Sequence, residues 1–340
     1  MNAAVTVFFL IIRVFSLYFL AVSLFGLCRR RTPEPAARLR RFAVLIAARN
    51  EESCIAGLIE SLRAQHYPEE LLDIYVVADN CTDDTARVAR QAGAAVYERH
   101  DQTRKGKGYA LDYLFHRLAE EGREDYEGYF VFDADNLVDP AFTAEMNRVF
   151  DTGKYGAITC YRNSKNFGSN WISAGYSIWF LREARFLNFP RMLLGSNCHV
   201  SGTGFLISAD VIRQNGGWPY HLLTEDIEFS VSCALKGVRI GYCDGAMVYD
   251  EQPTTFRDSW NQRFRWAKGF YQVFAHYAGG LVKGTLTNPR GYRFACYDML
   301  MTIAPGMLLT IVSVLFNAII VFLSLTGAMS TGIMVASSLS

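Results

Sequence analysis

The sequence predicts an α/β domain with a mostly parallel sheet, joined to apolar segments at both ends of a 340-residue chain. Three observations support this prediction. Short apolar runs alternate with stretches of helical periodicity between residues 42 and 255, as in a parallel sheet covered by helices. Acidic or polar residues follow directly after several of these runs. Two longer apolar runs, near the two ends of the chain, are long enough to span a bilayer.

Residues 1–28 are predicted to form a transmembrane anchor. Residues 5–27 are apolar except for Arg13, and about 20 such residues cross a bilayer as a helix. A cleaved signal peptide is the alternative, but its apolar stretch would be shorter, roughly 7–15 residues, and would follow basic residues. Three arginines at 29–31 come directly after the segment. The next domain is therefore expected on the cytoplasmic side of the cell membrane.

The cytoplasmic domain is predicted over residues 42–255. Residues 42–48 are continuously apolar, which is typical of a strand buried on both faces. Further strands are expected at 74–78, 95–98 and 129–132, with helical periodicity between them. Ligands of such sheets bind beyond the carboxyl ends of the strands. Polar clusters lie at three of these ends: Arg49-Asn50-Glu51, Asp79-Asn80 and Asp133-Ala134-Asp135.

Asp133 and Asp135 are candidate metal ligands. They flank one residue after a predicted buried strand, and alternate residues of an extended chain point the same way. Both carboxylates can therefore face one cation, and Mg²⁺ or Mn²⁺ suits oxygen ligands together with the phosphates of a substrate. A turn with solvated aspartates is the alternative for so short a motif. The position directly after a strand favours the metal site.

Other residues at the same sheet edge are candidates for binding a nucleotide. Asn50 and Glu51 follow the first strand. Asp79 could accept a hydrogen bond from a base or a ribose, or it could begin an Asx turn. Lys107 belongs to Arg-Lys-Gly-Lys-Gly at 104–108, where cations can pair with a diphosphate and glycines allow the backbone to approach it. A solvated basic loop is the alternative there.

Thr224-Glu225-Asp226 precedes a predicted helix that ends near residue 236. A structural role would explain the motif, because threonine is a good N-cap and carboxylates suit the positive end of a helix. The functional interpretation is that Asp226 is a general base that removes a proton from a hydroxyl group. Ser201-Gly202-Thr203-Gly204 is also open to two interpretations, a bend that faces a substrate or a β-bulge.

Residues 256–282 are predicted to form an amphipathic helix in the membrane surface, in contact with membrane lipids. Gln262, Arg265 and Trp266 point away from its apolar stripe, where a helix that only binds lipid has no need for a tryptophan. We therefore expect these three to face an active site, with ordinary packing as the alternative. The stripe contains Trp260, Phe264, Ala267, Tyr271 and Phe274, flanked by Arg257, Arg263 and Lys268.

A second transmembrane helix is predicted at 299–326, after basic residues at 283, 290 and 293. Residues 327–340 carry no charge and are a candidate start of a further membrane segment. The topology signals around both apolar segments place the domain between them in the cytoplasm.

Composition and spacing exclude several other classes of protein. The 33 acidic and 34 basic residues nearly cancel, which argues against binding nucleic acid. No two of the eight cysteines have C-x-x-C spacing, and the six histidines show no metal-ligand spacing. The cysteines are expected to be reduced. No G-x-G-x-x-G follows the first strand, which argues against a dinucleotide-dependent oxidoreductase.

In their order, these motifs resemble glycosyltransferase family 2 and, within it, the membrane-bound synthases of cellulose, hyaluronan, chitin and bacterial exopolysaccharides. The resemblance runs from about residue 42 to Lys268 and implies a GT-A fold with an inverting mechanism. By this resemblance, Asp79 contacts the nucleotide base, and Asp133 and Asp135 hold the metal and the diphosphate. Asp226 would be the base, and Gln262, Arg265 and Trp266 would border the acceptor and the donor diphosphate.

The expected function is transfer of a sugar from a nucleotide-sugar donor, a UDP-sugar in the first instance, to a saccharide acceptor in exopolysaccharide or cell-envelope synthesis. A polyprenyl-phosphate or other lipid-linked sugar transferase is the first alternative. An inactive membrane subunit that binds nucleotide belongs to a different class, and the intact aspartates argue against it. A nucleotidyltransferase would also use paired aspartates, but it would not explain the tryptophan motif at 262–266.

Overall fold

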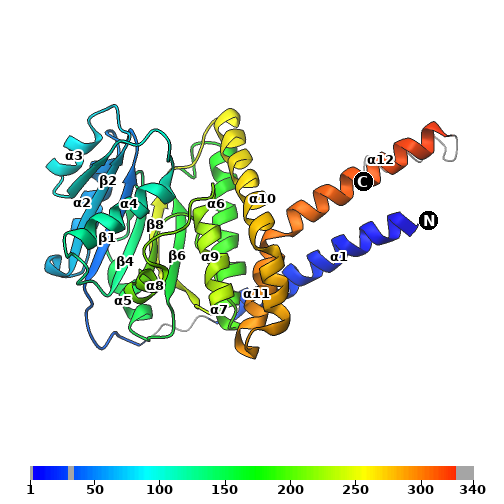
Figure 1. Ribbon diagram of the computed structural model, residues 1–340, viewed down its shortest axis with the longest axis horizontal. Helices are drawn as coiled ribbons and strands as arrows, with labels where there is room; N and C mark the ends of the chain where they lie inside the picture. The colour runs from blue at the N-terminus through cyan, green and yellow to red at the C-terminus, as the bar shows by residue number, and fades with distance from the viewer. Residues whose placement is uncertain (1–2, 30–33, 327–340) are drawn as a thin grey trace.

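The computed structural model describes residues 3–29 and 34–326 (Figure 1). Its centre is an α/β GT-A-type arrangement around a mixed, mostly parallel sheet with the strand order β3-β2-β1-β4-β7-β6-β8-β5. The strands are β1 (Phe42–Ala48), β2 (Leu72–Asp79), β3 (Ala95–Arg99), β4 (Gly128–Asp133), β5 (Leu137–Val138), β6 (Ala157–Ser164), β7 (Phe205–Ser208) and β8 (Ile240–Asp250).

Helices cover both faces of the sheet. In β1, Ala43 and Leu45 face one side and Phe42, Val44 and Ile46 face the other, and all five are buried. This is why the run reads as continuously apolar. The first face packs against α4 (Lys107–Glu120), α7 (Phe189–Leu193), α8 (Ala209–Asn215) and α9 (Glu225–Lys236). The second packs against α2 (Ile55–Arg63), α3 (Thr85–Gln91) and α5 (Phe142–Phe150).

The strands that the sequence predicted are all present, and β1 has the predicted bounds. From β3 through β2 and β1 to β4 the strands are parallel, so β1, β2 and β4 end at one edge of the sheet. Beyond β4 the direction reverses at β7, which pairs antiparallel with both β4 and β6. The carboxyl end of β4, where Asp133 lies, is thus next to the point where the sheet changes direction.

The helix predicted at 256–282 is α10 (Phe256–Thr287), which runs five residues further. Trp260 and Phe264 are exposed on its outer side, as predicted. Ala267 and Tyr271 were predicted on the same stripe, but both line a pocket beside the helix. Phe274 was assigned to the same stripe, and this is wrong. It is partly buried in a cluster that α10 forms with α9 and α11 (Arg290–Ile303).

Two helices at the ends of the chain, α1 (Ala3–Leu24) and α12 (Pro305–Leu325), contact each other and extend away from the domain (Figure 1). The single segment predicted at 299–326 is divided, because residues 299–303 are the last turn of α11, where Met299 is buried. Within the described ranges, no helix combines the length and the apolar character that crossing a membrane requires. The predicted transmembrane segments are therefore not confirmed, and the prediction for 327–340 lies outside the described residues.

Three further segments complete the wall next to these helices. Helix α6 (Trp171–Glu183) begins with a capping box. The Asn170 side chain accepts from the Ser173 amide, and the Ser173 hydroxyl accepts from the Asn170 amide. It continues directly into a π-helical turn, η3 (Ala184–Asn188), and then into α7. A short 3₁₀ helix, η1 (Phe25–Leu27), follows α1 and contacts η3. All eight cysteines are free, as expected.

Candidate active site

A pocket of about 990 Å³ opens where β1 and β4 end. Its walls also come from the start of α4, the 199–204 loop, the start of α9 and the inner face of α10. The volume is at the upper end of the usual range for small-molecule sites, roughly 300–1,000 Å³. The predicted site residues that line it are Glu51, Lys107, Asp133, Asp135, Asp226, Gln262, Arg265 and Trp266.

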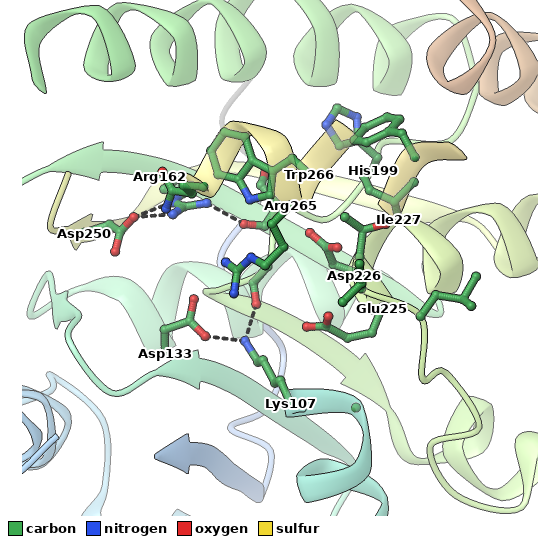
Figure 2. A pocket seen from close by; sticks show the side chains of 18 of the residues that line it. Lys107, Asp133, Arg162, His199, Glu225, Asp226, Ile227, Asp250, Arg265 and Trp266 are labelled. Atoms are coloured by element: carbon green, nitrogen blue, oxygen red, sulfur yellow. Dashed lines mark hydrogen bonds and ion pairs between the residues drawn. The ribbon is translucent and has the colours of Figure 1, made fainter. Parts of the chain in front are cut away.

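Lys107 connects three parts of the pocket (Figure 2). It is the first residue of α4, and its Nζ donates to the carboxylate of Asp133 and, at 2.6 Å, to the carbonyl of Gly202. Gly108 allows α4 to begin here, because a Cβ on that residue would lie 2.1 Å from the Tyr220 carbonyl oxygen. The Asp133 amide in turn donates to the Thr203 hydroxyl. Lys107, the end of β4 and the 199–204 loop are therefore held together.

Asp135 carries the electrostatic evidence for a cation site. Burial, together with the negative charges of Asp250, Asp133 and Glu51, raises the pKa of Asp135 to about 7. Among the described residues, no group of three or more His, Cys, Asp or Glu side chains is arranged as a metal site. Two aspartates with substrate phosphates suffice for Mg²⁺ or Mn²⁺, which is usually bound by one or two carboxylates. The crowded carboxylates fit such an ion.

Glu225 and Asp226 enter the pocket from the first turn of α9. Burial raises the pKa of Asp226, and the nearby Lys107 and His199 partly offset this increase. Burial and the charge of Asp226 raise the pKa of Glu225 to about 8. Asp226 Oδ2 lies 3.6 Å from the position that a Cβ on Gly202 would take. Asp226 is thus on the same side of the sheet as Asp133, across the Gly202 backbone (Figure 2).

The predicted N-cap role of Thr224 is wrong. No cap hydrogen bond forms, and the Thr224 hydroxyl is buried without a hydrogen-bond partner within the described chain. Its side chain instead packs against α10, since a Cβ on Gly269 would lie 2.4 Å from Thr224 Cγ2. The glycine therefore sets how closely α10 approaches the start of α9.

The inner face of α10 supplies the upper wall of the pocket. The Trp266 ring packs edge-on against Tyr176 of α6, with 5.9 Å between centroids. In Figure 2 the Arg265 side chain points down toward Asp133 and Lys107. The Gln262 Oε1 atom is buried and has no partner in the part of the chain that the structure covers. All three residues line the pocket, on the side of the helix that the sequence predicted.

A chain of buried polar groups supports the 199–204 loop. Arg162 binds the Asp250 carboxylate and donates at 2.8 Å to the Ser201 carbonyl. The Ser201 hydroxyl donates to Glu183 at the end of α6, and His199 Nε2 lies 3.4 Å from the same carboxylate. Against the effect of burial, His199 and Ser201 hold the pKa of Glu183 at about 2. This placement agrees with the interpretation of Ser201-Gly202-Thr203-Gly204 as a bend that faces a substrate.

Two predicted nucleotide-binding residues do not line the pocket. Asp79 is buried and forms an ion pair with Arg99, with 2.6 Å between Oδ1 and Nη1. The Asn50 side chain accepts from the Thr82 amide at 2.8 Å. Asn50 and Asn80 both adopt positive φ, 57° and 54°, directly after β1 and β2. Such turns cluster at functional sites, but here they hold the ends of the strands together.

Several pocket residues were not predicted. Arg49 follows β1 next to the predicted Asn50, and Glu225 precedes Asp226, so adjacency was a signal for both. No such signal marked four other pocket residues, because they are far apart in sequence and meet only in the fold: Arg162, His199, His221 and Asp250. The histidines show no metal-ligand spacing, and this gave no reason to single out His199 and His221, which line the pocket.

The carboxylates of Asp133, Asp135 and Asp226 and the Lys107 ammonium thus line one pocket at the carboxyl edge of a sheet with the GT-A arrangement. Residues 40–269 match the family described as "Glycosyltransferase like family 2". Since the match covers most of the chain, the protein belongs to glycosyltransferase family 2.

Two relatives of this chain have names that describe different activities. A β-monoglucosyldiacylglycerol synthase from Nostoc sp. is 26% identical over 77% of this chain and 56% of its own length. A poly-β-1,6-N-acetyl-D-glucosamine synthase from Staphylococcus epidermidis is 27% identical over 67% of this chain and 54% of its own length. The chain thus spans about half the length of the curated relatives it matches.

Two solved structures share the fold. The mannosyltransferase PcManGT from Pyrobaculum calidifontis, in complex with GDP-Man and Mn²⁺, aligns with a TM-score of 0.72 and 18% identity, covering 99% of this chain and 90% of its own. Staphylococcus aureus TarS 1–349 in complex with UDP-GlcNAc aligns with a TM-score of 0.52 and 17% identity, covering 76% and 70%.

Proposed function

We propose that the protein is an inverting, metal-dependent glycosyltransferase that moves a sugar from a nucleotide diphosphosugar to a hydroxyl group of an acceptor. One observation carries the proposal: Asp133 at the end of β4 and Asp226 in the first turn of α9 line the same pocket. Lys107 joins Asp133 to the Gly202 carbonyl, and Asp226 lies against the same glycine. A candidate phosphate and metal ligand would then lie opposite a candidate base. GDP-Man and UDP-GlcNAc in the structural neighbours support a nucleotide-sugar donor.

The donor diphosphate is proposed to bind at the floor of the pocket. Lys105, Lys107 and Arg265 bring positive charge there, and such groups stabilise charge that develops on a leaving phosphate. Asp133 and Asp135 would hold Mg²⁺ or Mn²⁺, which neutralises the departing nucleoside diphosphate when bound. Mn²⁺ in the complex of PcManGT is consistent with this choice.

The acceptor hydroxyl is proposed to approach from the side of Asp226. Its oxygen attacks the anomeric carbon, the bond from that carbon to the diphosphate breaks, and the nucleoside diphosphate leaves with the electron pair. The Asp226 carboxylate takes the hydroxyl proton. Attack opposite to the leaving group inverts the configuration of the sugar. The names of the relatives cover both a glycolipid and a polysaccharide product, so a saccharide of the cell envelope and a lipid are the two acceptor classes.

The catalytic domain is proposed to lie against the cytoplasmic side of the cell membrane through the outer face of α10. Trp260 and Phe264 are 61% and 65% exposed there, and Arg257 and Lys268 lie on the same helix. Aromatic side chains with flanking cations bind anionic lipid surfaces. Replacing Trp260 and Phe264 with alanine should reduce flotation with phosphatidylglycerol vesicles. Leu39→Ala, an exposed change before β1, is the control. Equal flotation of all variants would refute this contact.

The experiment for the proposed activity is nucleotide release from a panel of UDP- and GDP-sugars by the full chain in detergent. At least one donor should be cleaved by the wild type. Asp226→Asn should still bind that donor but transfer about 10²–10⁴-fold more slowly, the usual contribution of a general base. Asp210→Asn, on the exposed side of α8, is the matched control. Full turnover in Asp226→Asn would remove the assignment of the base.

A further inference from the structure

The pocket has a second arm that the donor does not need. Its floor, made by strand ends and the first turns of α4 and α9, is charged. Its other end lies among α1, α6, η3, α10 and α11, with the Arg162 guanidinium of β6 at 4.2 Å from the Phe180 ring centroid. The apolar side chains that line this arm are Phe19, Trp179, Phe180, Leu187, Phe270 and Ile303.

We propose that this arm binds the hydrocarbon part of the acceptor, and that the acceptor is therefore a lipid with a hydroxyl group in its headgroup, such as an acylated glycerol. The inference rests on the proposed function, since it assigns the acceptor of the same site. In this arrangement the headgroup hydroxyl lies at Asp226, and the chains extend between α1 and α6.

Polar groups in the arm are already bonded to one another, which argues against a saccharide in it. Arg191 donates to both Asp298 oxygens and to the Thr302 hydroxyl. It also donates to His199 Nδ1 at 2.8 Å, which leaves the His199 ring proton on Nε2, toward Glu183. A saccharide would lose its hydrogen bonds to water here and find few replacements, at a cost in affinity. A hydrocarbon chain makes no hydrogen bonds to water and therefore loses none when it enters the arm.

Arg182 is the exception among the polar groups of the arm. Its guanidinium lies 5.4 Å from the Trp179 ring centroid, and no carboxylate in the described ranges pairs with it. Trp179 is 52% exposed, and Ile178 and Leu181 beside it are also exposed. The arm therefore continues to an apolar outer edge of α6, through which chains longer than the pocket can leave it.

The π-helical turn shapes the wall of the arm. Helix α6 widens into η3 at Ala184, directly after Glu183, and Leu187 from this turn lines the arm. Such turns are rare in helices and frequently occur at functional sites. Helix α1 packs on the same turn, so Phe19 closes the arm from the opposite side.

The base at the floor of the pocket favours a hydroxyl acceptor over a lipid phosphate. Asp226 faces the reacting position. A phosphomonoester is already largely deprotonated at pH 7 and has no use for a base, whereas a hydroxyl group requires one. The alternative of a polyprenyl-phosphate acceptor is therefore disfavoured by the site itself.

The test compares acceptors for the full chain in mixed micelles, with the donor that supports nucleotide release. Dioleoylglycerol, undecaprenyl phosphate, glycerol and a water-soluble β-glucan oligosaccharide are supplied in turn, and labelled sugar is counted in organic and aqueous phases. We expect label on dioleoylglycerol and a kcat/KM for it far above that for glycerol. Preferred labelling of the oligosaccharide or of the polyprenyl phosphate would overturn the inference.

Variants on one helix test the arm itself. Trp179→Ala should raise the KM for dioleoylglycerol about tenfold, since part of an indole's apolar contact is lost. Trp179→Phe should restore most of it. Trp171→Ala, also exposed on α6 but outside the pocket, is the matched control and should leave this KM unchanged. An unchanged ratio of kcat/KM between dioleoylglycerol and glycerol in Trp179→Ala would refute the arm.

The two proposals fail in different ways. If no UDP- or GDP-sugar is cleaved under any condition, the proposed glycosyltransferase activity itself is refuted. If a donor is cleaved and its sugar reaches water or a soluble hydroxyl but never a lipid, only the assignment of the arm is refuted.

Discussion

At the scale of single residues, the buried carboxylate of Asp226 makes transfer sensitive to acid. Asp226 accepts a proton only when ionised, and burial raises its pKa. As pH falls through that raised pKa, the protonated, inactive fraction grows. We expect kcat to fall roughly tenfold per pH unit on the acid side, beginning above pH 3.9, the ordinary value for aspartate. A pH profile of kcat at saturating donor measures this.

Glu225→Gln tests whether Asp226 is the group that titrates. Burial and the charge of Asp226 raise the pKa of Glu225 to about 8, so Glu225 is already protonated on the acid side of the profile. Replacing this neutral carboxyl group with an amide should therefore leave the acid limb of the kcat profile in place. A limb that moves in Glu225→Gln would mean that Glu225, and not Asp226, controls the rate.

Metal dependence is a second prediction at this scale. Asp133 and Asp135 are the proposed ligands, and Asp135 lies among negative charges that an ion would neutralise. EDTA should stop transfer, and Mn²⁺ or Mg²⁺ should restore it. Asp133→Ala should raise the Mn²⁺ concentration for half-maximal nucleotide binding at least tenfold, because losing even an outer-shell partner costs about 10–100-fold. Asp125→Asn, exposed and outside the pocket, is the control, and an unchanged Mn²⁺ titration in Asp133→Ala would contradict the ligand role.

At the scale of elements, continuous apolar runs predicted β1, β2 and β4 because these strands are mostly buried on both faces. Phe42–Ala48 has no exposed residue to interrupt the run. The antiparallel half was not predicted. In β8, residues 240–243 pair with β6 before the register shifts, and mixed burial after Asp244 hides the pattern.

Motif order predicted most of the pocket, but it wrongly included Asp79 and missed His199. An aspartate at the end of a buried strand can face a ligand or a neighbouring strand, and the arginine that pairs with Asp79 comes from β3, twenty residues later. The His199 ring is held by Arg191 and Glu183. Contacts between segments this far apart leave no local signal in the sequence.

The approach of α10 to α9 gives a prediction about a glycine. A Cβ on Gly269 would lie 2.4 Å from Thr224 Cγ2, so Gly269→Ala should push α10 and its Trp266 away from Asp226. We expect kcat to fall at least tenfold, since small displacements in a site are costly. Gly279→Ala on the same helix meets nothing within 4 Å and is the control.

A compensating change separates this contact from a general loss of stability. Thr224→Ala removes Cγ2 and Oγ1, the two nearest of the three Thr224 atoms that the new methyl would meet, and the hydroxyl has no hydrogen-bond partner within the described residues. The double variant with Gly269→Ala should therefore regain part of the lost kcat. If Thr224→Ala does not improve the Gly269→Ala enzyme, the contact does not position α10.

At the scale of the whole molecule, one buried carboxylate joins the terminal helices to the site. Asp298 of α11 accepts from Tyr18 of α1 at 2.7 Å, from Ser196 and from Arg191, which also binds His199. Asp298 and Arg191 are each 1% exposed. Docking of α1 and α11 and the position of the 199–204 loop thus depend on the same ion pair.

Asp298→Asn should therefore lower both stability and turnover. Removing one partner of a buried ion pair leaves an uncompensated charge on Arg191, at a cost of about 3–5 kcal/mol. Tyr18→Phe removes one hydrogen bond to a charged group and should cost less, about 1.5–3 kcal/mol. Thermal unfolding in detergent, followed by tryptophan fluorescence, ranks the two variants against Asp210→Asn. Because the loop at Gly202 borders Asp226, kcat should fall in the same order at temperatures where every variant is folded. A variant with reduced stability but wild-type kcat would show that the network holds the helices without positioning the site.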